Sequence, residues 1–70
     1  MIAKYETIEE AEATLMAMRD AAKYNQKMEI FSSLDGSHGI AKHNELERGF
    51  PWTKMTQGDV ERMIKTGDWR

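Results

Sequence analysis

The stretch of sequence that decides the fold is residues 7–24, TIEEAEATLMAMRDAAKY. Apolar side chains recur there at steps of three and four, which places them on one face of an α-helix: Ile8, Ala11, Leu15, Met18 and Ala22. Thr7 stands where an N-cap belongs, and Glu10 follows three residues later, which is the capping-box pattern. The sequence therefore predicts one long amphipathic helix that ends near residue 24 and is the packing partner of the shorter segments around it.

Three segments outside this helix are predicted to be β-strands, namely residues 1–6, 27–34 and 39–43. In the second segment Met28, Ile30 and Leu34 share one face. Phe31 interrupts the alternation, which indicates either that both faces are covered or that a bulge shifts the register. Asp35-Gly36 follows directly and is a strong hairpin signal, so we expect the second and third strands to be antiparallel neighbours.

The C-terminal third of the chain contains a second, shorter helix. Thr56 and Asp59 repeat the spacing of a cap and its reciprocal acid, and Gly67 stands where a C-terminal glycine cap belongs. The apolar stripe of this helix consists of Val60, Met63 and Ile64. Before it, residues 44–47 favour a single helical turn, and residues 50–52, Phe-Pro-Trp, are expected to close one end of the core with two rings.

Together these elements predict a single α+β domain over residues 1–70, in the order β-α-β-β-α. We expect a small antiparallel sheet of about three strands, packed against the long N-terminal helix, with a short C-terminal helix beside it. An all-α domain, with residues 27–43 helical, is the alternative. Gly36 and Gly39 count against that alternative, because glycine weakens helices.

Size and charge narrow the classes of partner. The chain has 70 residues, 40% of them hydrophobic, no cysteine and a net charge of −2. A domain this small buries only about 60% of the surface of its unfolded chain, so we expect self-association into a homo-oligomer to add stability.

No third of the chain is strongly basic, which disfavours nucleic acid as a partner. No apolar run approaches the ~20 residues of a membrane span, and no secretory signal is present, so we expect the cytoplasm, its own or that of a host.

Residues with chemical potential gather in the predicted hairpin: Asp35, Gly36, Ser37, His38 and His43. Histidine is a common acid, base and metal ligand, and glycine amides can approach a phosphate. On the predicted strand, however, His38 and His43 point to opposite faces, so their imidazoles do not converge. A metal site needs three or four ligands, and the spacing supplies no third one. We therefore assign no catalytic, cofactor-binding or metal-binding residue.

The interpretation that remains is a non-enzymatic protein-binding module, an accessory or inhibitory protein of the kind that viruses also encode, which occupies a macromolecular partner through its surface. Large and cationic side chains near the C-terminus are the predicted contact residues, because tryptophan and arginine are enriched in binding hot spots: Trp52, Met55, Arg62, Trp69 and Arg70. Met16 and Met55 lie outside the apolar stripes and are expected to be exposed. The alternative function is a binder of a small ligand (phosphate or nucleotide) or a hydrolase that uses the 35–43 hairpin, assembled across a homodimer interface.

Overall fold

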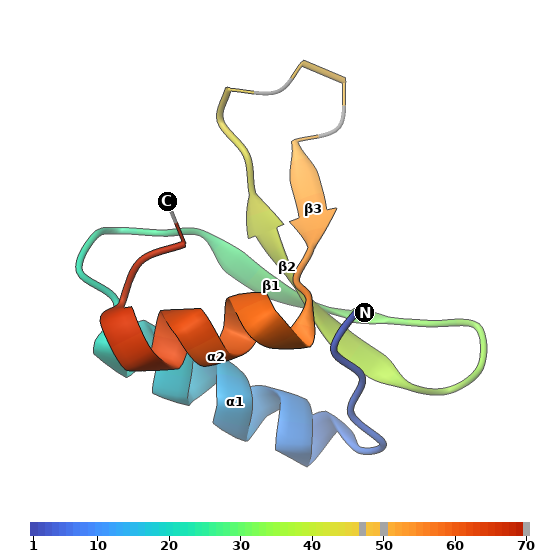
Figure 1. The fold of residues 1–70 in the computed structure, drawn as a ribbon. Helices are drawn as coiled ribbons and strands as arrows, with labels where there is room; N and C mark the ends of the chain where they lie inside the picture. The colour runs from blue at the N-terminus through green and yellow to red at the C-terminus, as the bar shows by residue number, and fades with distance from the viewer. Residues whose placement is uncertain (47, 50, 70) are drawn as a thin grey trace.

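The computed structural model describes residues 1–46, 48–49 and 51–69. Its elements follow one another in the order α1 (Ile8–Ala21), β1 (Met28–Ser32), β2 (His38–His43), β3 (Trp52–Lys54) and α2 (Gln57–Thr66) (Figure 1). The predicted α+β class is confirmed, with two helices and a three-stranded antiparallel sheet. In the described part of the chain, neither helix has the length and apolar character needed to cross a bilayer.

Helix α1 begins as the sequence predicts. The side chain of Thr7 accepts a hydrogen bond from the Glu10 amide at 3.2 Å, which satisfies one of the free donors of the first turn. The helix ends at Ala21, before the predicted residue 24, and Ala22 is already extended with φ −60° and ψ 129°. The buried side chains of α1 are Ala11, Leu15 and Met18.

The sheet has the strand order β1-β2-β3, and both pairs of neighbours are antiparallel. The register runs without interruption from Met28 opposite Lys42 to Ser32 opposite His38. There is therefore no bulge at Phe31, and partial cover on both faces explains the broken pattern. Phe31 lies opposite Gly39, whose missing side chain leaves room for the aromatic ring.

The N-terminal segment is not a strand of this sheet. It crosses from the start of α2 to the start of β2 and forms only isolated bridges, between Ile2 and Thr56 and between Tyr5 and His38. The third strand is instead Trp52–Lys54, which pairs with β2 where two core-closing rings were expected. Residues 44–46 form a turn and no helix, while residues 47 and 50 of the predicted turn and plug lie outside the described residues.

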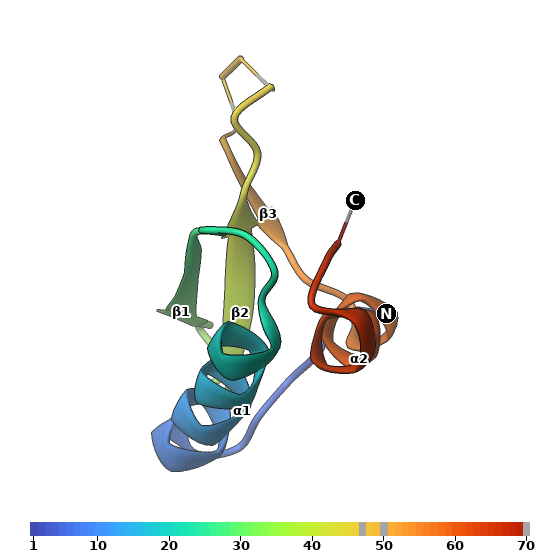
Figure 2. The ribbon, with the colours of Figure 1, turned by 90° about the vertical axis from the view of Figure 1, so that its left-hand side faces the viewer.

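The core lies between the inner face of the sheet and the two helices, which Figures 1 and 2 show on the same side of it. Nine described apolar residues are buried: Ala3, Ala11, Leu15, Met18, Met28, Ile40, Met55, Val60 and Met63. Met55 was expected to be exposed and is fully buried, because the alternation of β3 carries its side chain inward. Met16 is exposed, as predicted, and Leu34 is fully exposed in the turn after β1.

Helix α2 confirms both predicted end signals. Thr56 and Asp59 form the capping box, in which each side chain accepts a hydrogen bond from the other residue's amide. Gly67 ends the helix in the left-handed conformation with φ 76°, and its carbonyl accepts a hydrogen bond from the Lys23 amide at 2.9 Å. This bond ties together the C-terminal ends of the two helices.

Candidate functional site

The outer face of the sheet, which is turned away from the two helices, is the candidate functional site. Strand alternation places these residues on it: Glu29, Phe31, Gly39, Ala41, His43, Trp52 and Lys54. A groove of about 400 Å³ runs across this face between Phe31 and Trp52, with Ala41 at its floor. Trp52 is 39% exposed and Phe31 is partly exposed, so both rings are accessible from solvent.

Cross-strand contacts hold the two rings in place. The Phe31 ring lies over Gly39, and a Cβ atom at that glycine would overlap the ring. The Lys54 ammonium lies 5.0 Å from the centre of the same ring, which is cation–π geometry. Trp52 packs edge-on against His43, with ring centres 5.0 Å apart and planes at 76°. Both aromatic side chains are thus oriented by neighbouring strands without being part of the core.

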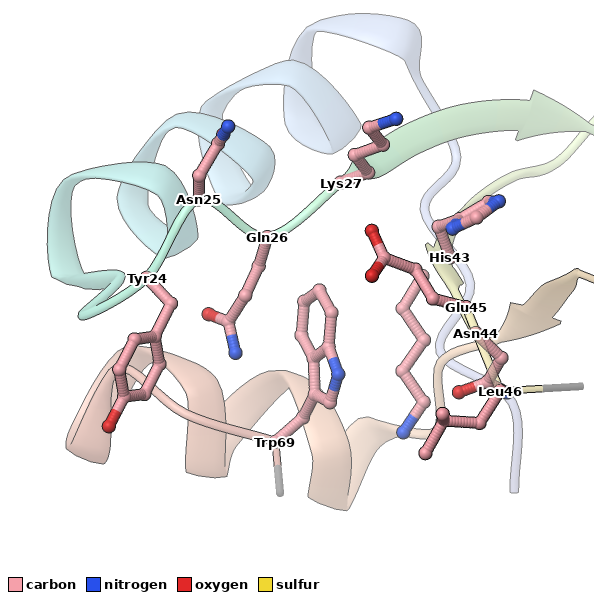
Figure 3. Close-up of a pocket in the computed structure, with 10 residues that line it drawn as sticks. Tyr24, Asn25, Gln26, Lys27, His43, Asn44, Glu45, Leu46 and Trp69 are labelled. Atoms are coloured by element: carbon pink, nitrogen blue, oxygen red, sulfur yellow. The ribbon is translucent and has the colours of Figure 1, made fainter.

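A second hollow, of about 570 Å³, opens at one end of the sheet between the segment after α1 and the end of β2 (Figure 3). The half-buried ring of Trp69 forms one wall, and the Gln26 amide beside it donates to Asp68 at 3.3 Å. Two buried polar atoms of this region, Gln26 Oε1 and His43 Nδ1, have no hydrogen-bond partner among the described residues. Buried polar atoms without a protein partner are ordinarily satisfied by ordered water.

Lys42 connects this hollow to the helix layer. Its ammonium lies 3.8 Å from an Asp59 carboxylate oxygen and 5.9 Å from the centre of the Trp69 ring. Burial opposes ionisation of Asp59, but the hydrogen bond from the Thr56 amide and the charge of Lys42 outweigh it, so the pKa of Asp59 is lowered. Asp59 therefore serves the helix cap and the ion pair together.

The hairpin residues that suggested ligand chemistry are engaged with one another. Asp35 accepts hydrogen bonds from the Ser37 amide at 3.0 Å and the Ser37 hydroxyl at 2.6 Å, and it pairs with Lys4 at 3.3 Å. The hydrogen bonds from Ser37, with a smaller contribution from Lys4, lower the pKa of Asp35 to about 2. Gly36 has φ 85°, the left-handed conformation that this turn requires.

The two histidines lie at opposite ends of β2 and on opposite faces, as the alternation predicted. His38 Nδ1 is hydrogen-bonded to the Ser32 hydroxyl at 3.1 Å, and the backbone of His38 pairs with Tyr5, whose hydroxyl has its pKa raised by burial. Among the described residues, no group of three or more His, Asp or Glu side chains is placed to hold a metal ion. The hairpin thus forms a structural turn.

The structure does not bring the predicted contact residues together. Met55 is buried in the core, which excludes it from any surface. Trp69 is half-buried, Arg62 lies on α2 next to Asp59, and Arg70 lies outside the described residues. Only Trp52 is on the outer face. Sequence reasoning missed Phe31 and Lys54 as its neighbours, although the interrupted alternation at Phe31 was a usable signal for a ring on that face.

Comparison of the chain with protein-family models, with curated proteins and with solved structures gives no significant match. Function has to be argued from the residues themselves.

Proposed function

We propose that this protein is a small binding module that occupies another protein through the outer face of its sheet. The observation that carries this proposal is the groove between Phe31 and Trp52, which neither helix of the described residues covers. The solvated face of an antiparallel sheet is ordinarily polar. Two accessible aromatic rings on such a face are typical of a contact surface, since large aromatic side chains dominate binding hot spots.

Charge indicates the chemistry of the partner. Lys54 stands at the rim of the groove with the Phe31 ring as its neighbour, and none of the ion pairs among the described residues involves it. An apolar side chain flanked by a carboxylate would fill the groove and pair with this ammonium. The proposed partner is therefore a protein surface that presents an apolar anchor beside an acidic residue.

A module of this kind acts by covering the surface it binds, so the proposed activity is accessory or inhibitory, in the cytoplasm. The small-ligand alternative has less support at the 35–43 hairpin, because the polar atoms of Asp35, Ser37 and His38 already bond to one another or to nearby residues.

The test is capture from native host cells with the tagged protein, followed by titration of the purified partner. Trp52→Ala and Phe31→Ala are each expected to weaken the measured affinity about tenfold or more, because truncating a hot-spot ring costs at least ~2 kcal/mol. Met16→Ala is the control, since Met16 is an exposed apolar residue on α1, away from the outer face of the sheet. Circular dichroism verifies that each variant is folded. Wild-type affinity in Trp52→Ala and Phe31→Ala would refute the proposed surface.

A further inference from the structure

Strand β1 forms one edge of the sheet, because the strand order places β2 on one side of it only. The bonded pairs at the two ends of the β1–β2 ladder are Lys27 with His43, at 3.0 Å, and Ser33 with Ser37, at 2.9 Å. In an antiparallel ladder bonded and non-bonded pairs alternate, so Met28, Ile30 and Ser32 direct their backbone amides and carbonyls away from β2. These groups form an edge that can pair with another strand.

Little of this edge is covered within the chain. The Arg19 guanidinium donates to the Met28 carbonyl at 3.2 Å and protects the beginning of the strand. No hydrogen bond given by the described residues uses the outward backbone groups of Ile30 or Ser32. Exposed edges are ordinarily protected by a proline, an inward charge or a bulge. β1 has no proline, its register is regular, and the side chain of Ile30 is only partly buried.

We propose that β1 pairs with β1 of a second copy of this chain, antiparallel and about a twofold axis at Ile30, so that two sheets join into one. In this register Ile30 faces Ile30, Met28 faces Ser32, and the outward amides and carbonyls close a new ladder. Arg19 gives up the Met28 carbonyl to the incoming strand. This inference goes beyond the proposed function, because it concerns the backbone edge of β1 and a second copy of this chain, although Phe31 and Lys54 take part in both contacts.

Charge complementarity selects the second copy as the occupant. The register sets Glu29 opposite Phe31 of the second copy, on the outer face, and each Phe31 ring has the Lys54 ammonium 5.0 Å from its centre. Two symmetric Glu29–Lys54 pairs follow from the twofold axis. Within one chain these two residues are separated by Ala41 of the central strand, and they form no ion pair there. Opposite charges across a strand pair are favourable, and like charges are destabilising.

The test measures the mass of the isolated protein by sedimentation equilibrium across a wide range of concentrations. We expect the wild type to dimerise with rising concentration. Glu29→Lys and Lys54→Glu are each expected to weaken dimerisation about tenfold, because each converts two symmetric attractions into repulsions. The double variant, Glu29→Lys with Lys54→Glu, is expected to recover most of the lost affinity. Glu61→Lys and Lys65→Glu, on the exposed side of α2, are the charge-matched controls and should dimerise as the wild type does.

A protein that is monomeric at every concentration would overturn the proposal. Wild-type dimerisation affinity in both single variants would also overturn it, because the interface would then lie elsewhere. A double variant that dimerises as weakly as the single ones would do the same. Amide exchange gives a second readout, since the Ile30 amide should become protected only in the dimer. The sample contains this chain alone, so a negative result leaves the proposed binding through Trp52 untouched, and the reverse also holds.

Discussion

The two faces of the sheet use the same strands for different purposes. On the inner face Met28 and Ile40 are 2% and 0% exposed and belong to one core cluster with buried residues of both helices. On the outer face, Phe31 of β1 and Trp52 of β3 remain accessible. Alternation thus divides five-residue and six-residue strands into a side that holds the domain together and a side available for contact.

The kinds of side chain on the two faces differ as well. Four of the nine buried apolar residues are methionines, whereas the phenylalanine and the tryptophan of the sheet, Phe31 and Trp52, face outward. Methionine is unbranched and fills irregular gaps, which suits a core assembled from short elements. Rigid rings are better suited to a surface that must present one shape to a partner. The contrast teaches that the two largest apolar side chains of the sheet lie outside the core.

The strongest way to break this comparison is to truncate one side chain on each face. Ile40→Ala is expected to lower the free energy of unfolding by about 3 kcal/mol, because it opens a cavity at a fully buried position. Trp52→Ala, although it removes more atoms, is expected to cost about 1 kcal/mol, since its ring is largely supported by His43 alone. Urea unfolding followed by circular dichroism measures both. If Ile40→Ala leaves no folded protein while Trp52→Ala remains folded, the expected ranking of the two faces is already met. Equal losses on the two faces would contradict the division.

The outer face can be tested through the glycine beneath its ring. Gly39→Ala should push the Phe31 ring off the strand and cost about 1–2 kcal/mol, as overpacking does, because the new methyl group would overlap the ring. Gly58→Ala in α2 is the matched control. Its nearest neighbour would be the Thr56 hydroxyl at 3.7 Å, so it should be neutral or stabilising by about 0.5–1 kcal/mol. Thermal unfolding and the chemical shifts of the Phe31 ring protons report the two effects. An unmoved ring in Gly39→Ala would show that Phe31 is not held over that glycine.

The smallest expected effect concerns the turn that joins β1 to β2. The pKa of Asp35 is about 2 in the folded protein, below the ~3.9 of an unfolded aspartate. Ionised Asp35 therefore stabilises the fold above pH ~4, and this contribution is lost as the pH falls from ~4 to ~2. At neutral pH the melting temperature of Asp35→Asn should be slightly lower than that of the wild type. Between pH ~4 and ~2 the melting temperature of the variant should fall less steeply than that of the wild type. The pKa of Asp59 is also lowered, so Asp59 contributes its own acid response, which Asp35→Asn leaves in place. An unchanged acid profile would show that the Ser37 bonds do not persist in solution.

Local signals in the sequence were sufficient for the helices and for the hairpin. Thr7, Thr56 and Gly67 act through bonds to residues three or four positions away, so their roles can be read without knowledge of the fold. The Asp35-Gly36 turn and the opposite faces of His38 and His43 are local in the same sense. The α+β class followed from these features.

The features that the sequence analysis missed depend on pairing between strands that are far apart in the sequence. Strand β3 has three residues directly after Pro51, and it exists only because β2 offers it a pairing edge. That pairing also turns Met55 inward, which its neighbours in the sequence do not indicate. Tyrosine is favoured in β-strands, but Tyr5 pairs only at an isolated bridge. The contact surface could not be assembled in advance, because Phe31 and Trp52 lie on opposite sides of a central strand whose partners were not known.

Burial in the core determines which methionine sulfurs of the folded protein an oxidant can reach. Met1 and Met16 lie open to solvent, whereas Met18, Met28, Met55 and Met63 have at most 2% of their surface accessible. A peroxide that meets the folded protein reacts at the two accessible sulfurs, and the other four are reached only when the chain opens. Sulfoxide formed at those four sites is too polar to return to the interior. Oxidation of an opened chain is therefore close to irreversible, and the lifetime of the protein under oxidative conditions depends on how often and how long the core opens.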